Sequence, residues 1–126
     1  MHLILLKDTL AVCRLAPGTA LPDWARGSLV SVTHTADESS VLCALESVPD
    51  TVKTEKPWRA FRVAGTLDFN EIGILSALAK PLADAAISIF VVSTFDTDYL
   101  LVKAGRLKDA VSVLEQNGHK VSRAST

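Results

Sequence analysis

The clearest hydrophobic pattern lies in the second half of the chain. Residues 58–65, "WRAFRVAG", alternate between apolar and polar positions, which is typical of a half-buried strand. Farther on, apolar side chains recur at three- and four-residue spacing and predict one face of a helix, at Ile72, Leu75, Leu78, Ala79 and Leu82. Asp68 and Glu71 stand three residues apart, as in a capping box, so we expect this helix to begin near Asn70.

Pro81 lies inside the helical pattern, and we expect the helix to bend or split there because a proline ring clashes with the carbonyl four residues earlier. Two strand-like runs follow, "ISIFVVSTF" and "YLLV". A last helix is marked by Leu107, Ala110, Val111 and Leu114 and closed by Gly118, with a short strand expected at 120–122. This order predicts a ferredoxin-like arrangement, an antiparallel sheet with helices on one face.

The first half of the chain has shorter apolar runs. "HLILL" and "LAVCRL" are separated by three polar residues and predict a strand pair near the N-terminus. Prolines and glycines then leave room for at most a short helix around Asp23 to Arg26. "LVSVTHT" and "SSVLCAL" are again strand-like, and the polar stretch 48–57 is bounded by prolines, as in a linker. We therefore expect two units, residues 1–57 and residues 58–126.

The two halves show a weak internal repeat. Setting "SVTHTADESSVLCA" against "VVSTFDTDYLLVKA" places Thr33 opposite Ser93 and Asp37 near Asp96, with one inserted residue. Either the chain contains a duplicated unit, or two strand-turn-strand segments of similar composition match by chance. The duplicated reading predicts an α+β fold of two ferredoxin-like units in tandem.

Composition narrows the range of functions. The chain has 126 residues, of which 48% are apolar and 21% charged, and this balance favours a packed core over disorder. The formal charge is −1 and the basic residues are scattered, which argues against nucleic-acid or anionic-membrane partners. The N-terminal apolar run is too short for a signal peptide, and no run is long enough to span a bilayer. We expect a cytoplasmic protein.

Catalytic and metal chemistry find little support in the sequence. Cys13 and Cys43 sit inside apolar runs, where cysteine usually packs as a small hydrophobe. The histidines are scattered and lack the paired spacing of a zinc site. No glycine-rich phosphate loop or catalytic constellation accompanies the acidic residues near position 96. We therefore expect no enzyme activity, no catalytic residues, no metal and no cofactor.

The stretch "FRVAGTLDFNEIGILSALAKPLADAAISIFVVSTFDTDYLLV" resembles the ACT-domain family, in particular small tandem-ACT proteins similar to the ACT regions of CASTOR-type arginine sensors. The resemblance is close over residues 58–118, where "STFDTDY" is the most specific piece, and residues 1–57 fit as a more divergent first ACT-like unit with a shortened first helix. It implies an amino-acid-binding regulatory or sensor module, assembled as a homodimer through sheet edges or helices. Many members hold the amino acid at the interface between two ACT units.

The matching residues offer both halves of an amino-acid site. Backbone amides near the start of the helix form a seat for a carboxylate, while acidic side chains and strand-end hydroxyls accept from an ammonium. The expected ligand-binding residues are Asp68, Asn70, Glu71, Ile72, Gly73, Ile74, Leu75, Ser93, Thr94, Phe95 and Asp96.

Structural roles compete with each of these assignments. Asp68 and Glu71 are also good helix caps, and Asp96 and Asp98 are good turn formers. Gly73 either allows close backbone approach or avoids a clash with a neighbouring strand. The rival function is a ligand-free oligomerisation or interaction module that docks on a partner enzyme.

Overall fold

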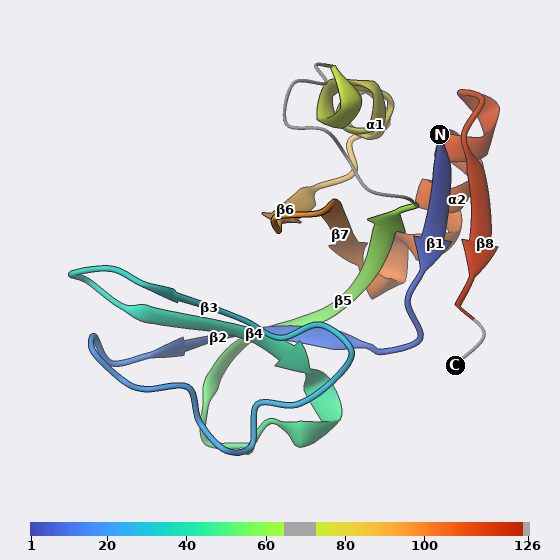
Figure 1. The fold of residues 1–126 in the computed structure, drawn as a ribbon. Helices are drawn as coiled ribbons and strands as arrows, with labels where there is room; N and C mark the ends of the chain where they lie inside the picture. The colour runs from blue at the N-terminus through green and yellow to red at the C-terminus, as the bar shows by residue number, and fades with distance from the viewer. Residues whose placement is uncertain (65–72, 125–126) are drawn as a thin grey trace. The chain divides into compact units, whose positions relative to one another are not determined.

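The computed structural model describes residues 1–64 and 73–124 and divides the chain into two compact units (Figure 1). We call Met1–Lys7 together with Arg59–Thr126 unit 1, and Asp8–Trp58 unit 2. The first seven residues thus belong with the C-terminal part of the chain. Strand β5 (Lys53–Val63) runs through the boundary, so its first half lies in unit 2 and its second half in unit 1.

Unit 1 is an α+β unit whose strands lie in the order β6-β7-β5-β1-β8. Its further elements are β1 (His2–Leu5), α1 (Ile74–Asp84), β6 (Ile89–Ser93), β7 (Asp98–Lys103), the 3-10 turn η2 (Ala104–Arg106), α2 (Leu107–Gln116) and β8 (Lys120–Arg123). From β5 onward the chain order is strand, helix, strand, strand, helix, strand. The ferredoxin-like order and the short final strand are therefore confirmed.

Strand β1 is inserted between β5 and β8 (Figure 1). It pairs antiparallel with β5, with Leu5 opposite Phe61, and parallel with β8, with Leu3 opposite Val121. The expected pairing of the first two apolar runs is wrong, because β1 buries Leu3 and Leu5 in unit 1 and both of its edges are already paired there. One parallel pair thus enters a sheet that was expected to be antiparallel throughout.

The core of unit 1 lies between this sheet and the two helices. Leu78 and Leu82 of α1 are fully buried, and so are Ala110 and Leu114 of α2. They pack in one cluster with strand residues, namely Leu3, Leu5, Phe61, Val63, Leu100 and Val102. The apolar stripe of α1 is therefore a core-packing face.

Helix α1 begins later than expected, and of the two outcomes expected at Pro81, a bend or a split, the split does not occur. It begins at Ile74, not near Asn70, because its N-cap Gly73 has φ +83, a left-handed conformation that ends a right-handed helix. Pro81 does not split it, since the helix runs on to Asp84. Proline has no N–H to donate to the Ala77 carbonyl, and His119 Nε2 donates to that oxygen instead, at 3.3 Å.

Unit 2 is a sheet of order β3-β4-β2-β5, formed by β2 (Leu10–Leu15), β3 (Ser31–His34), β4 (Ser39–Ala44) and the first half of β5, with the 3-10 turn η1 (Leu45–Ser47) after β4. Residues 8–58 contain no α-helix. The short helix expected around Asp23 is a turn, in which the Ala25 N–H donates to the Pro22 carbonyl at 3.1 Å. The expected linker 48–57 already contains the first residues of β5, because Thr54 and Glu55 pair with β2.

The hairpins β3–β4 and β6–β7 have the same strand register at a constant offset of 59 residues, as from His34 to Ser93 and from Ser39 to Asp98. Their last strand pairs are His34 with Ser39 and Ser93 with Asp98, and the 3-10 turns η1 and η2 follow at the same offset. Each turn begins with a threonine, Thr35 or Thr94, whose N–H donates to the carbonyl three residues later. The internal repeat is thus present in the structure without the inserted residue that the sequence alignment required.

Candidate functional site

The β6–β7 turn lies at the edge of unit 1 where β5 ends. Thr97, only 8% exposed, donates its hydroxyl to the Val63 carbonyl at 2.8 Å. Val63 is the last residue of β5, the strand that precedes α1 in the chain. This hydrogen bond therefore fixes the turn to the strand end from which the chain leaves toward the helix.

Inside the turn, hydroxyl groups organise the backbone. The Thr94 N–H donates to the Thr97 carbonyl at 2.8 Å, and the Thr97 N–H donates to Thr94 Oγ1 at 3.3 Å. Across the last strand pair, Ser93 Oγ donates to Asp98 Oδ1 at 2.6 Å. Asp98 is therefore a turn-stabilising residue, while Asp96 is exposed at the tip beside Phe95.

The start of α1 supplies the expected backbone donors, but at later residues than the sequence indicated. The first bond of the helix runs from the Ala77 N–H to the Gly73 carbonyl, at 2.9 Å. The amides of Ile74, Leu75 and Ser76 therefore precede the hydrogen-bonded ladder and point out of the helix start. These donors belong to residues 74–76, and Ser76 is not among the residues that the sequence predicted.

The backbone conformation at position 73 requires glycine. A Cβ built on it meets no atom of the described residues within 4 Å, so avoidance of a clash with a neighbouring strand is not its role. Its φ of +83 lies in the region that glycine adopts without strain. Gly73 therefore sets the direction in which the helix starts.

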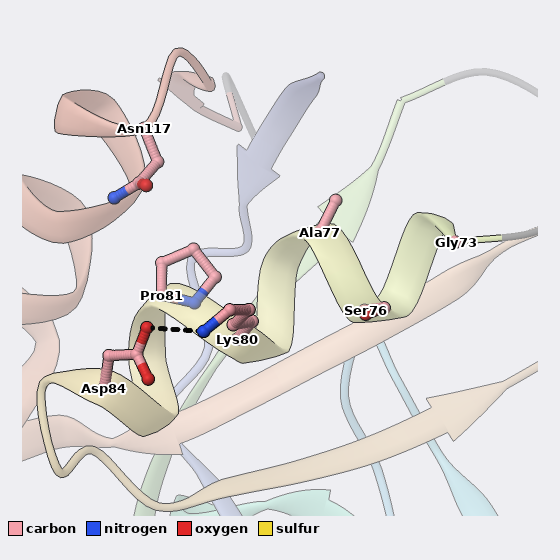
Figure 2. Close-up of a pocket in the computed structure, with 7 residues that line it drawn as sticks. All are labelled: Gly73, Ser76, Ala77, Lys80, Pro81, Asp84 and Asn117. Carbon is pink, nitrogen blue, oxygen red and sulfur yellow. Dashed lines mark hydrogen bonds and ion pairs between the residues drawn. The ribbon is translucent and has the colours of Figure 1, made fainter.

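A hollow of about 420 Å³ runs along α1 from this N-cap (Figure 2). Among the residues that the structure describes, it is lined by Gly73, Ser76, Ala77, Lys80, Pro81, Asp84 and Asn117. Lys80 Nζ and Asp84 Oδ2 form an ion pair at 3.0 Å on its wall. The only sequence signal for it was the polar positions between the apolar positions of the helix, and no described residue of the β6–β7 turn lines it.

The expected site residues thus fall into three groups. Asp68, Asn70, Glu71 and Ile72 lie outside the described residues. At the start of α1, Gly73 is exposed and Ile74 and Leu75 are half-buried. Ser93, Thr94, Phe95 and Asp96 form the exposed end of the β6–β7 hairpin. That the last two groups share one ligand stays a prediction.

The part of the chain that the structure describes gives little support for metal binding or for a nucleophilic cysteine. No three histidine, cysteine, aspartate or glutamate side chains there form a group that could hold a metal ion. Burial, and secondarily the nearby Cys13, raises the pKa of the Cys43 thiol, so this cysteine stays protonated and is a poor nucleophile. Both cysteines are buried, as expected for core residues. No helix among the described residues could cross a membrane.

Comparison with protein families gives two matches. A family model described as an ACT domain matches residues 53–116. A second model, described as an N-terminal domain, matches residues 8–51. Together they cover most of both units.

Individual relatives resemble the chain to different extents. The human protein named cytosolic arginine sensor for mTORC1 subunit 1 is 40% identical over 60 residues, which are 47% of this chain and 18% of the sensor. The chain thus matches less than a fifth of that relative's length. A crystal structure from Agrobacterium tumefaciens is 36% identical with a TM-score of 0.91, covering 99% of this chain and 94% of that one. The regulatory subunit of aspartate kinase from Thermus flavus shares the fold, with a TM-score of 0.64 at 8% identity over 93% of this chain and 97% of that one.

Proposed function

Because this chain belongs to the ACT domain family, we propose that it is a cytoplasmic, non-catalytic regulatory module that senses a free amino acid. A relative that is 40% identical over 60 residues is named an arginine sensor, which supports this class of ligand. We place the ligand at the edge of unit 1 where two ACT units of a homodimer meet. The downstream target would be a partner protein such as an enzyme.

The chemistry of the two ends of an amino acid fits this edge. The amides of Ile74, Leu75 and Ser76 would donate to the carboxylate, helped by the positive end of the helix dipole. Asp96 would accept from the ammonium, since Asp98 already accepts from Ser93. The hydrogen bonds to both ends of the amino acid would be stronger once a second copy shields the site from water.

One observation carries the proposal, the hydrogen bond from Thr97 to the Val63 carbonyl. It holds the acidic turn against the end of the strand that precedes α1 in the chain, and this supports a shared edge for the acceptors of the turn and the donors of the helix start. Strand β7 already pairs with β5, and this bond in addition ties the turn itself to the last residue of β5.

The second candidate is a ligand-free interaction module. Phe95 is 82% exposed at the tip of the hairpin, and β6 is an outer strand of unit 1 that carries the exposed Val91. Exposed apolar side chains on an outer strand favour pairing with another chain. This alternative needs no amino acid.

Thermal melts with each of the twenty amino acids test the proposal. At about 100 times its dissociation constant, a ligand should stabilise the folded protein by about 2.7 kcal/mol and raise the melting midpoint. Asp96→Asn should reduce this shift, because the amide cannot carry the charge that pairs with an ammonium. Asp37→Asn is the matched control, since Asp37 holds the equivalent position in the β3–β4 turn, and it should keep the full shift.

Light scattering combined with the melts separates the two candidate functions. A dimer together with an amino-acid-dependent melt supports the sensor. A dimer whose melt responds to none of the twenty amino acids would favour the interaction module, and a monomer would contradict a site shared between copies.

A further inference from the structure

Arg59 is the first residue of β5 that belongs to unit 1, and the hydrogen bonding of its guanidinium is unusual. Its Nη2 donates to the Leu6 carbonyl at 3.0 Å, whereas its Nε is buried and has no hydrogen-bond partner among the described residues. Neither this arginine nor Arg123 has an ion pair with a described carboxylate. Arg59 is therefore a partly buried cation whose charge the described chain leaves uncompensated.

Arg123 lies on the same side of the sheet. It pairs in register with Leu5 on β1, and Leu5 pairs with Phe61 on β5. Leu5 and Phe61 both belong to the core cluster beneath the helices, and Arg59 is two residues before Phe61. Since alternate residues of a strand share a face, Arg59 and Arg123 both project from the helix-bearing face, at the end where β1 leaves the sheet.

The charges of the two arginines act on each other. Burial, and secondarily the positive charge of Arg123, lowers the pKa of the Arg59 guanidinium. Arginine stays protonated at neutral pH even so, and a desolvated cation beside a like charge is unfavourable unless an anion compensates it. A basic pair of this kind usually has an acidic partner in the fold, and here no described residue supplies one.

We propose that Arg59 and Arg123 form a binding site for a small oxyanion, separate from the amino-acid edge of unit 1. Guanidinium groups bind oxyanions through paired, charge-assisted N–H donors. Arg59 has one Nη2 proton committed to Leu6, which fixes its guanidinium, and Arg123 brings five further donors from the exposed end of β8. The anion would neutralise the pair and so stabilise this end of the sheet.

Inorganic phosphate is the probe, used on the full chain with chloride at matched ionic strength as reference. About 10 mM phosphate, enough to saturate a millimolar site, should raise the melting midpoint of the unaltered protein. Arg123→Gln should weaken phosphate binding about tenfold or more, because it removes charged hydrogen bonds to the anion. Lys120→Gln changes the same charge on the same strand and should leave binding unchanged.

Arg59→Gln is the second variant. If Arg59→Gln fails to fold, Arg123→Gln still tests the site. A midpoint that rises with phosphate in the unaltered protein and in Lys120→Gln, but not in Arg123→Gln, supports the site. An equal rise in Arg123→Gln, or no rise in the unaltered protein beyond that in chloride, overturns it.

Discussion

Hydroxyl groups, more than carboxylates, hold the acidic turn in place. Thr94 closes the turn, Ser93 binds Asp98, and Thr97 reaches the carbonyl of Val63. The same residue types appear in the β3–β4 turn, where Thr35 Oγ1 accepts from the N–H groups of Asp37 and Glu38. At both turns the sequence showed the polar residues, but only the structure showed which of them is buried.

Thr97→Val tests the contribution of that buried hydroxyl. Valine keeps the shape of threonine but leaves the Val63 carbonyl without the Thr97 donor, so the free energy of unfolding should fall by about 1 to 2 kcal/mol. Chemical denaturation measures it. Thr97→Ser retains the hydroxyl and should lose less, and a serine variant as unstable as the valine variant would assign the effect to packing.

Helix α1 shows how one backbone angle changes the effect of a glycine on stability. In a continuous helix, glycine would cost stability relative to alanine. At φ +83 Gly73 instead permits the helix start, and the cost falls on any residue with a Cβ. The helix also lacks the Pro81 donor at Ala77, and His119 supplies one from beyond α2.

Gly73→Ala should therefore destabilise the protein by about 1 to 2 kcal/mol, the cost of the left-handed conformation for an L-residue. Thermal and denaturant unfolding measure the change. Gly105→Ala is the control, because Gly105 has no positive φ and no atom of the described residues within 4 Å of an added Cβ. It should be neutral or stabilising by up to about 1 kcal/mol. Stabilisation by Gly73→Ala would show that the helix extends through that residue.

On the scale of the whole molecule, the first seven residues complete unit 1, which is otherwise formed by the C-terminal part of the chain. Strand β1 lies between β5 and β8 and buries Leu3 and Leu5 in the core of unit 1. The chain then builds unit 2 and returns along β5, which serves both units. A cut at the expected boundary, between residues 57 and 58, would therefore remove an interior strand from unit 1.

Residues 58–126 alone should fail to form a stable unit 1, because β5 and β8 lose the partner that both of them bind. Amide NMR spectra should show poor dispersion, and melts should lack a cooperative transition. Residues 1–7 joined through a flexible linker ahead of residue 59 should restore both. A well-dispersed spectrum from residues 58–126 would show that β5 and β8 can pair directly.

The sequence by itself determined the elements of unit 1, because local periodicity records which face of each helix or strand is buried. The stripe at Leu78 and Leu82, the alternation around Phe61 and the two strands of the β6–β7 hairpin all needed only neighbours in the chain. The same reasoning identified the turn residues Ser93 to Asp96 as a polar feature.

Only the tertiary structure decided the partners. Whether the run at Leu3 pairs with its neighbour in sequence or with β5 and β8 depends on which distant edges are open, and no local pattern carries that information. The same holds for the φ of Gly73, for the bond from Thr97 to Val63 and for the juxtaposition of Arg59 with Arg123. Each joins residues, or fixes a backbone angle, through packing that exists only once the chain has folded.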